Sequence, residues 1–170
     1  MKKRIFPLGL IIILSSTFFA CTPKLTEHPS LPEQNFAFRF EFGACYTDIL
    51  DTFNGTFTKD LIFDPAITIP FQLSNEQMIS VYQEMIEIDF FDYPDVFSIP
   101  NRTAFQTPAE RYHIVVRNGN ISKTLDWTDE VIEPVTSEAD NLRNLFQIIM
   151  EMISASPEYK KLPEPKGGCA

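Results

Sequence analysis

The sequence predicts an α+β domain: an antiparallel sheet of about five to six strands with two amphipathic helices packed on one face. Several segments place apolar residues at every second position, which is typical of strands with one buried face. Asn-Gly pairs lie within these segments and favour two-residue hairpin turns, so neighbouring strands should pair antiparallel. Two longer segments repeat apolar residues at helical spacing, and such helices must bury that face against another layer.

The first predicted strand lies in the stretch NFAFRFEFG, which begins at residue 35. Its alternation places Phe36, Phe38, Phe40 and Phe42 on one face, and four rings together predict a large share of the core. The alternative is an exposed platform on which nucleic-acid bases stack. The acidic balance of the chain and the large apolar patch that a platform would expose both argue against it.

Two or three more strands should follow before the first helix. Asn54-Gly55 lies between two runs rich in β-branched and aromatic residues, which predicts a hairpin. The run AITIPFQL, residues 66–73, predicts another strand. Pro70 lacks the backbone N–H that a central strand needs, so we expect this strand at a sheet edge or at a bulge.

The first helix is predicted from about residue 75 to residue 88. Ser74 and Gln77 have the spacing of a capping box. The buried face of this helix should be formed by Met78, Val81, Tyr82, Met85 and Ile86. Residues 92–109 hold three prolines and are predicted to form a long loop, and its unusual length makes it a candidate functional segment.

A second hairpin is predicted around Asn118-Gly119. The alternation on either side of this turn directs six residues inward: Tyr112, Ile114, Val116, Ile121, Leu125 and Trp127. We interpret the two aromatic members as core or rim residues, with a ligand clamp as the alternative. His113 falls on the opposite, wetter face.

The last helix should begin near Ser137, a plausible N-cap, and Pro157 should end it. Its apolar stripe comprises Leu142, Leu145, Phe146, Ile149, Met152 and Ile153. The tail that follows is rich in proline and locally basic, with Lys160, Lys161 and Lys166. These lysines would contact an acidic partner or the domain's own acidic surface, unless the tail is mobile.

The first 20 residues have the pattern of an export signal. Lys2, Lys3 and Arg4 form a positive start, residues 5–14 are mostly apolar, and Ala20 precedes Cys21. The apolar stretch is too short for a membrane span, which needs about 20 apolar residues.

This segment resembles the leader of bacterial lipoprotein precursors, whose lipobox ends in the cysteine that receives lipid. Ala20 and Cys21 match that pattern, whereas Phe18 replaces the usual Leu and Phe19 replaces a small residue. The resemblance implies that Cys21 carries fatty acyl chains such as palmitate and anchors the protein to a membrane of the cell envelope. Thr22, in place of Asp, favours the outer membrane where the host has one. A plain signal peptide cut nearby and an uncleaved anchor are the alternatives.

Three further stretches, DTFNGTFTKDL, EIDFFDYP and YKKLPEPKGG, are loosely similar to small, uncharacterised bacterial lipoproteins. Such families have no assigned chemistry, so the similarity implies a location and a fold and no catalytic residue. The resulting organisation is a signal peptide over residues 1–20, a lipidated cysteine and flexible tether over residues 21–34, and one α+β domain with a proline-rich tail over residues 35–170.

The charge of the mature chain argues against nucleic acid as a partner. Three of the 14 basic residues lie in the leader, so 11 remain against 23 acidic ones, a formal charge of −12. Such a surface repels phosphate backbones. A basic protein patch, a cationic peptide or metal ions would fit it better.

Cys45 and Cys169 remain in the mature chain. The exported compartment permits disulfides, so we predict a bond between them, with two unpaired thiols as the alternative. The bond would pin the tail to the sheet and stabilise the fold by at most about 4–5 kcal/mol.

Two acidic stretches are candidate sites. Asp89, Asp92 and Asp95 offer closely spaced oxygen ligands of the kind that Ca²⁺ prefers, although the pattern is not that of an EF-hand. A solvated turn at a helix end is the simpler interpretation. We therefore expect no metal site here.

The second stretch, Asp126, Asp129, Glu130 and Glu133, contains carboxylates that would support acid–base chemistry if their pKa values were separated. A solvated loop is the simpler interpretation. His113 would serve as a general base only beside such a partner. The sequence has no nucleophile elbow, P-loop or zinc-protease motif, so we expect neither an enzyme nor a cofactor.

These observations favour a lipid-anchored, non-catalytic domain that binds an envelope protein, a peptide or a small ligand. A structural role in an envelope complex is the alternative. An enzyme that uses His113 and the acidic segments is a third possibility, and a deep pocket holding carboxylates with displaced pKa values would favour it.

Replacing Cys21 by Ser should release the protein from membranes, because the acceptor of the fatty chains is lost. Fractionation of the native host, followed by detection of the protein in the soluble and membrane fractions, measures this. A Cys45→Ser variant is the matched control and should stay in the membrane fraction. Membrane retention of the Cys21→Ser variant would contradict the lipid anchor.

Overall fold

The computed structural model describes residue 32 and residues 35–168. Seven strands form one sheet in the order β4-β3-β2-β1-β6-β7-β5. The elements are β1 (Ala37–Gly43), β2 (Asp48–Asp51), β3 (Thr56–Leu61), β4 (Asp64–Pro70), α1 (Asn75–Glu87), η1 (Phe90–Asp92), β5 (Val96–Phe97), β6 (Ala104–Asn118), β7 (Ile121–Glu133), α2 (Ser137–Ala155) and η2 (Tyr159–Lys161).

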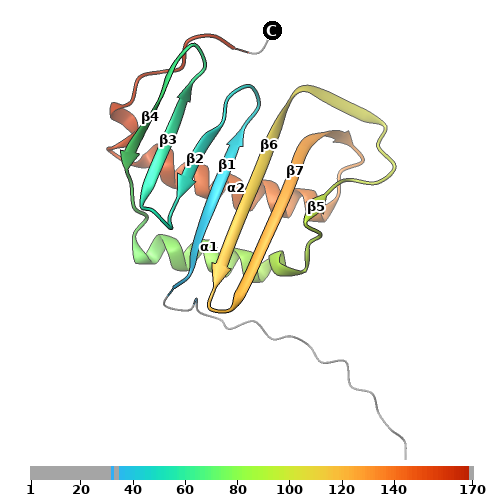
Figure 1. Ribbon diagram of the computed structural model, residues 1–170. Coiled ribbons are helices and arrows are strands. Elements are labelled where there is room, and N and C mark those ends of the chain that lie inside the picture. Colours follow the sequence, from blue (N-terminus) through green and yellow to red (C-terminus); the bar gives the residue numbers. More distant parts are fainter. Residues whose placement is uncertain (1–31, 33–34, 169–170) are drawn as a thin grey trace, which may run out of the picture.

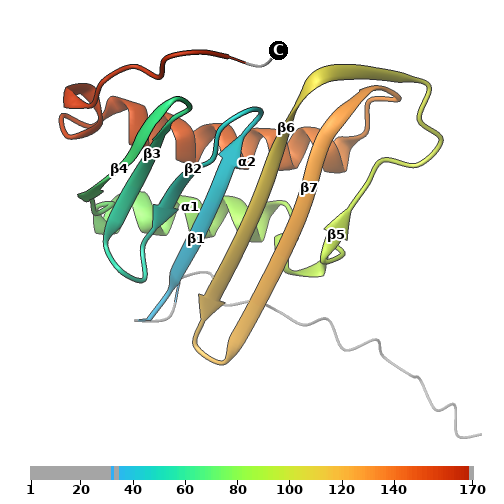
Figure 2. The same ribbon diagram turned by 45° about the horizontal axis from the view of Figure 1, so that its top comes forward.

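The two helices lie on the same face of the sheet and run across its strands (Figures 1 and 2). All neighbouring strands pair antiparallel except β5, which pairs parallel with β7. The predicted class, an antiparallel sheet with two helices on one face, is therefore confirmed. The opposite face of the sheet carries neither α1 nor α2.

The strand number and the predicted long loop need correction. The seventh strand, β5, lies within residues 92–109 and has only two residues, too few for any periodic signal. β6 also begins within this segment, at Ala104, so the hairpin with β7 is longer than predicted. The register of the hairpin shifts between Phe105 and Glu110. This irregularity, together with Pro108, hides the first half of β6 in the sequence.

The predicted row of phenylalanines on β1 is buried. Phe38 and Phe40 are fully buried, and Phe36 and Phe42 nearly so. Because β1 is the middle strand, its rings contact both helical and strand neighbours. The ring of Phe40 stacks on Phe146 of α2, with 4.9 Å between the centroids. Each buried ring contributes about 1.5–3 kcal/mol to folding.

The predicted start of α1 is confirmed in detail. Ser74 is the N-cap, its hydroxyl accepts a hydrogen bond from the backbone N–H of Gln77, and the side chain of Gln77 accepts one from the backbone of Ser74. The start of α2 differs from the prediction by one residue. Thr136 is its N-cap and accepts from the N–H of Ala139, since Thr caps a helix as Ser does.

The edge position predicted for the strand with Pro70 is confirmed, because β4 is the outermost strand beside β3. The two aromatic residues predicted to lie in the core or at its rim, Tyr112 and Trp127, are buried. His113 lies on the wetter face and is about one-third exposed.

The C-terminal tail contacts the domain's own surface, one of the two contacts expected for its lysines. The backbone N–H of Lys166 donates to the carbonyl of Leu61, and its Nζ lies 2.9 Å from a carboxylate oxygen of Asp64. Cys45 is exposed in the loop between β1 and β2. Cys169 lies outside the described residues, so the bond between these two cysteines stays a prediction.

The leader, Cys21 and all but one residue of the tether also lie outside the described residues. Within the part of the chain that the structure describes, neither helix is both long and apolar enough to cross a bilayer.

Candidate functional site

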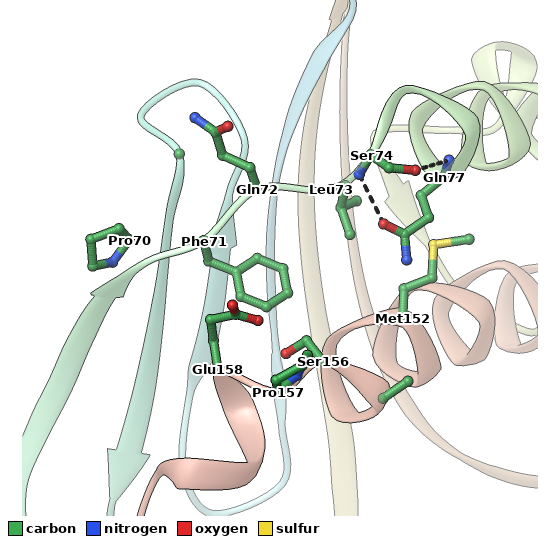
Figure 3. Close-up of a pocket in the computed structure, with 12 residues that line it drawn as sticks. Pro70, Phe71, Gln72, Leu73, Ser74, Gln77, Met152, Ser156, Pro157 and Glu158 are labelled. Carbon is green, nitrogen blue, oxygen red and sulfur yellow. Dashed lines mark hydrogen bonds between the residues drawn. The ribbon is translucent and has the colours of Figure 1, made fainter.

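A groove lies where α1 begins and α2 ends (Figure 3). One wall is the linker of residues 71–74 between β4 and α1, and the other is the C-terminal end of α2 with residues 156–158. Its volume is about 700 Å³. Small-molecule sites typically occupy about 300–1,000 Å³, so the groove is large enough for a ligand.

Local sequence signals set both walls. Pro70 ends β4, and the capping box of Ser74 fixes where α1 starts. At the other wall, α2 ends at Ala155, because Pro157 follows too closely for the helix to continue. The groove is therefore framed by one helix start and one helix end, both of which are fixed by the sequence.

The side chains that line the groove combine an apolar floor with a polar rim. Phe71 and Leu73 point from the linker toward α2, and Met152 points from α2 toward α1 (Figure 3). Gln72 points the other way, toward the β2–β3 turn, where its Nε2 lies close to Gly55. Ser74 and Gln77 are already bonded to each other's backbone.

Glu158 is the one titratable side chain among the residues that line this groove. The groove therefore offers apolar side chains, backbone and side-chain polar groups and one carboxylate to a molecule that enters it.

A separate buried polar pair lies where β2 begins and β3 ends. The register Ile49↔Thr58 places Asp48 opposite Lys59, on the face that the helices cover. Asp48 is 4% exposed and Lys59 is 2% exposed. Burial raises the pKa of Asp48 to about 6, although the backbone N–H of Asp60 and the charge of Lys59 partly oppose that rise.

The ammonium group of Lys59 contacts an aromatic ring and a distant carboxylate. Its Nζ lies 4.5 Å from the centroid of the Tyr159 ring and 3.8 Å from a carboxylate oxygen of Glu164. Among the residues that the structure describes, its Nζ has no hydrogen-bond partner. The nearby phenol of Tyr46 also has a raised pKa, first through burial and then through the charge of Asp48.

The acidic stretch from Asp126 to Glu133 was predicted as a solvated loop, and this is wrong. All four acids lie in β7, which extends to Glu133. Asp129 is 5% exposed, and its two oxygens accept hydrogen bonds from Nε and Nη2 of Arg143 at 2.8 and 2.6 Å. This pair joins β7 to α2, and it raises the pKa of the Arg143 guanidinium.

The structure brings two of the candidate residues together. His113 and Asp126 face each other across β6 and β7, with 2.7 Å between Nδ1 and Oδ1. A carboxylate at this nitrogen orients an imidazole as in hydrolytic triads. Such a triad also needs a nucleophile at the second ring nitrogen. The hydrogen bonds of residues 35–168 include none to Nε2 of His113.

The three aspartates proposed as oxygen ligands do not gather around a common point. Asp95 accepts a hydrogen bond from Nζ of Lys123 at 2.7 Å, and Asp89 adopts a left-handed backbone before η1. Across the described part of the chain, no three His, Cys, Asp or Glu side chains are arranged to hold a metal ion.

The chain matches no protein-family model and no curated protein.

Sequence reasoning missed the groove and the buried pair. The groove is formed by elements 80 residues apart, so no local pattern indicates it. Lys59 does have a signal: in the strand TFTKDL it occupies an inward position between Phe57 and Leu61. A charge on the buried face of a strand indicates either a bonded structural group or a site.

The buried carboxyl of Asp48 should make stability depend on pH. Its pKa is higher in the folded protein than in the unfolded chain, so the folded state binds the proton more tightly. This stabilisation is present below about pH 4 and is lost as pH rises through 6. Between these values the wild type should lose about 2–3 kcal/mol relative to Asp48→Asn.

Urea unfolding of both proteins at a series of pH values measures the difference in unfolding free energy. Asn still accepts the hydrogen bond from Asp60, so the variant is a matched comparison. An Asp92→Asn variant, which removes an exposed carboxylate, is the control. Its unfolding free energy should depend on pH as that of the wild type does. A constant difference between wild type and Asp48→Asn from pH 4 to 7 would contradict this assignment.

Proposed function

We propose that this chain is a lipid-anchored domain of the bacterial cell envelope that binds a ligand or partner without catalysing a reaction. The groove between the start of α1 and the end of α2 is the observation that carries the proposal. Its size suits a ligand, and Glu158 alone titrates within it. The resemblance of residues 1–21 to lipoprotein leaders supports the location.

The lining of the groove favours a peptide segment or a small ligand of mixed polarity. An apolar group would cover Phe71 and Met152, while amide or carbonyl groups would bond to the rim at Ser156 and Gln77. Recognition of this kind uses an apolar floor for affinity and a few polar groups for orientation.

The position of the first described strand supports a tethered domain. Asn35 accepts a hydrogen bond from the backbone N–H of Gly119, so the chain enters the domain beside the β6–β7 turn. Residues 22–34 would span at most about 45 Å when extended. That reach lets the domain stand clear of lipid headgroups, and the acidic mature chain opposes adsorption to an anionic surface.

The alternative is a structural role in an envelope complex. Phe63 is 80% exposed, and Phe105 and Val135 are more than half exposed. Exposed apolar side chains of this size favour contact with another protein when they gather into a patch. These three come from the β3–β4 turn, β6 and the segment before α2, so they do not follow one element.

A photoreactive residue placed at Glu158, an exposed residue that lines the groove, should crosslink in the native envelope to a discrete ligand or partner. Ala155→Trp fills the groove from the exposed end of α2, so this crosslink should disappear in the double variant. Ser154→Trp is the matched control, because its side chain is exposed on the same helix and does not line the groove. Crosslinking is read by mass spectrometry of the purified protein.

The result that contradicts the groove as the binding site is an identical crosslink with and without Ala155→Trp. Crosslinking of equal strength from Thr124, on the open face of the sheet, would favour the assembly role.

A further inference from the structure

We propose that Lys59 is the cation of a carboxylate-binding site, and that the C-terminal tail, residues 162–168, covers this site and occupies it through Glu164. The site is separate from the groove and is covered by the Tyr159 ring of η2. Its ligand would be a carboxylate, carried either by a peptide or by a small organic acid.

The first observation is the incomplete bonding of a buried charge. The side chain of Lys59 is 2% exposed, and no hydrogen bond to its Nζ is formed within the described residues. An ammonium group carries three donors. Leaving buried donors without partners destabilises the fold, and more so when the group is charged. Such a charge is retained at a cost to stability, which points to a binding role.

The buried ammonium of Lys59 is surrounded by three groups, one of which belongs to the tail. Tyr159 covers one side of the ammonium with its ring, and Asp48 lies opposite on the neighbouring strand. The carboxylate of Asp48 already accepts a hydrogen bond from Asp60 at 2.8 Å. Glu164 approaches from the remaining side, with its own side chain 89% exposed. Nζ itself is buried beneath these groups, so an acid from solvent reaches it only when the tail lifts.

Glu164 is an imperfect occupant of this position. Its oxygen lies 3.8 Å from Nζ, whereas charge-assisted hydrogen bonds have N···O distances of about 2.7–2.9 Å. Pro163 and Pro165 flank it and restrict the backbone to extended conformations. A ligand carboxylate without that constraint can approach closer, and its bond to Lys59 would be correspondingly stronger.

The tail is attached on both sides of Glu164 by contacts of modest strength. Before it, Leu162 packs against the core. After it, the backbone N–H of Lys166 donates to the carbonyl of Leu61 at 3.3 Å, Nζ of Lys166 pairs with Asp64 in an exposed ion pair, and Gly167 lies against the ring of Phe63. Exposed ion pairs contribute little to stability, because water screens them. The segment between these attachments can therefore lift away from Lys59 at a small cost.

Competition between Glu164 and a ligand follows from this arrangement. While Glu164 occupies the site, only the fraction of molecules with a lifted tail binds a carboxylate, so the apparent affinity is reduced by that fraction. Removing the charge of Glu164 should raise the affinity. Removing the charge of Lys59 should abolish it.

Acetate is the probe for the test, and the wild type is residues 22–170, the mature chain without its lipidated cysteine. Acetate replaces chloride at constant ionic strength, and NMR follows the side-chain resonances of isotopically labelled lysine. In Glu164→Gln, the Lys59 signal should shift saturably, with an apparent Kd lower than that of the wild type by roughly threefold or more. Glu87→Gln, which removes a charge at an exposed position of α1, should match the wild type.

Lys59→Met removes the charge and keeps the apolar stem of the side chain. In this variant the Lys166 signal of the nearby tail should show no saturable shift with acetate. If this variant does not fold, the comparison of Glu164→Gln with Glu87→Gln still tests whether Glu164 competes with acetate for Lys59. The absence of a saturable shift in Glu164→Gln would overturn the proposal, as would equal shifts in Glu164→Gln and Glu87→Gln.

Discussion

The contact between Phe40 of β1 and Phe146 of α2 holds the two layers of this protein together. The two rings stack with 4.9 Å between their centroids, and both residues are fully buried. The ring centroid of Tyr112 on β6 lies 4.6 Å from that of Phe146, so the contact includes the middle strand β1 and its neighbour β6. Aromatic pairs of this kind contribute beyond the area that they bury.

The remaining features depend on where this contact places α2. The helix crosses the sheet, so its beginning reaches β7 and its end reaches β3 and β4 (Figures 1 and 2). At the beginning, Arg143 bonds to Asp129 of β7. At the end, residues 155–158 form one wall of the groove, and the helical turn that follows brings Tyr159 over Lys59. Both proposed binding sites therefore lie at the end of α2, away from the aromatic centre.

The sequence predicts those parts of the fold that produce a repeating pattern of apolar residues or a local capping motif. The alternation through Phe36, Phe38, Phe40 and Phe42 indicates a buried strand, and the capping pair of Ser74 with Gln77 marks the start of α1, as the structure confirms. β5 was not predicted because a strand of two residues is too short to show an alternating pattern. The burial of Asp129 was not predicted because it depends on Arg143, 14 residues along the chain, which no local pattern connects to it. The groove and the Lys59 site are likewise made by packing of distant segments, so their geometry appears only in the folded chain.

A double-mutant cycle at Phe40 and Phe146 tests the central contact most directly. Urea unfolding of Phe40→Leu, Phe146→Leu and the double variant gives their coupling free energy. We predict a coupling of about 1 kcal/mol or more, as expected for residues in direct contact. The same cycle with Phe40 and Phe71, whose rings lie in different parts of the core, should be additive. Additivity within about 0.4 kcal/mol for Phe40 and Phe146 would contradict the role of this contact in joining the layers.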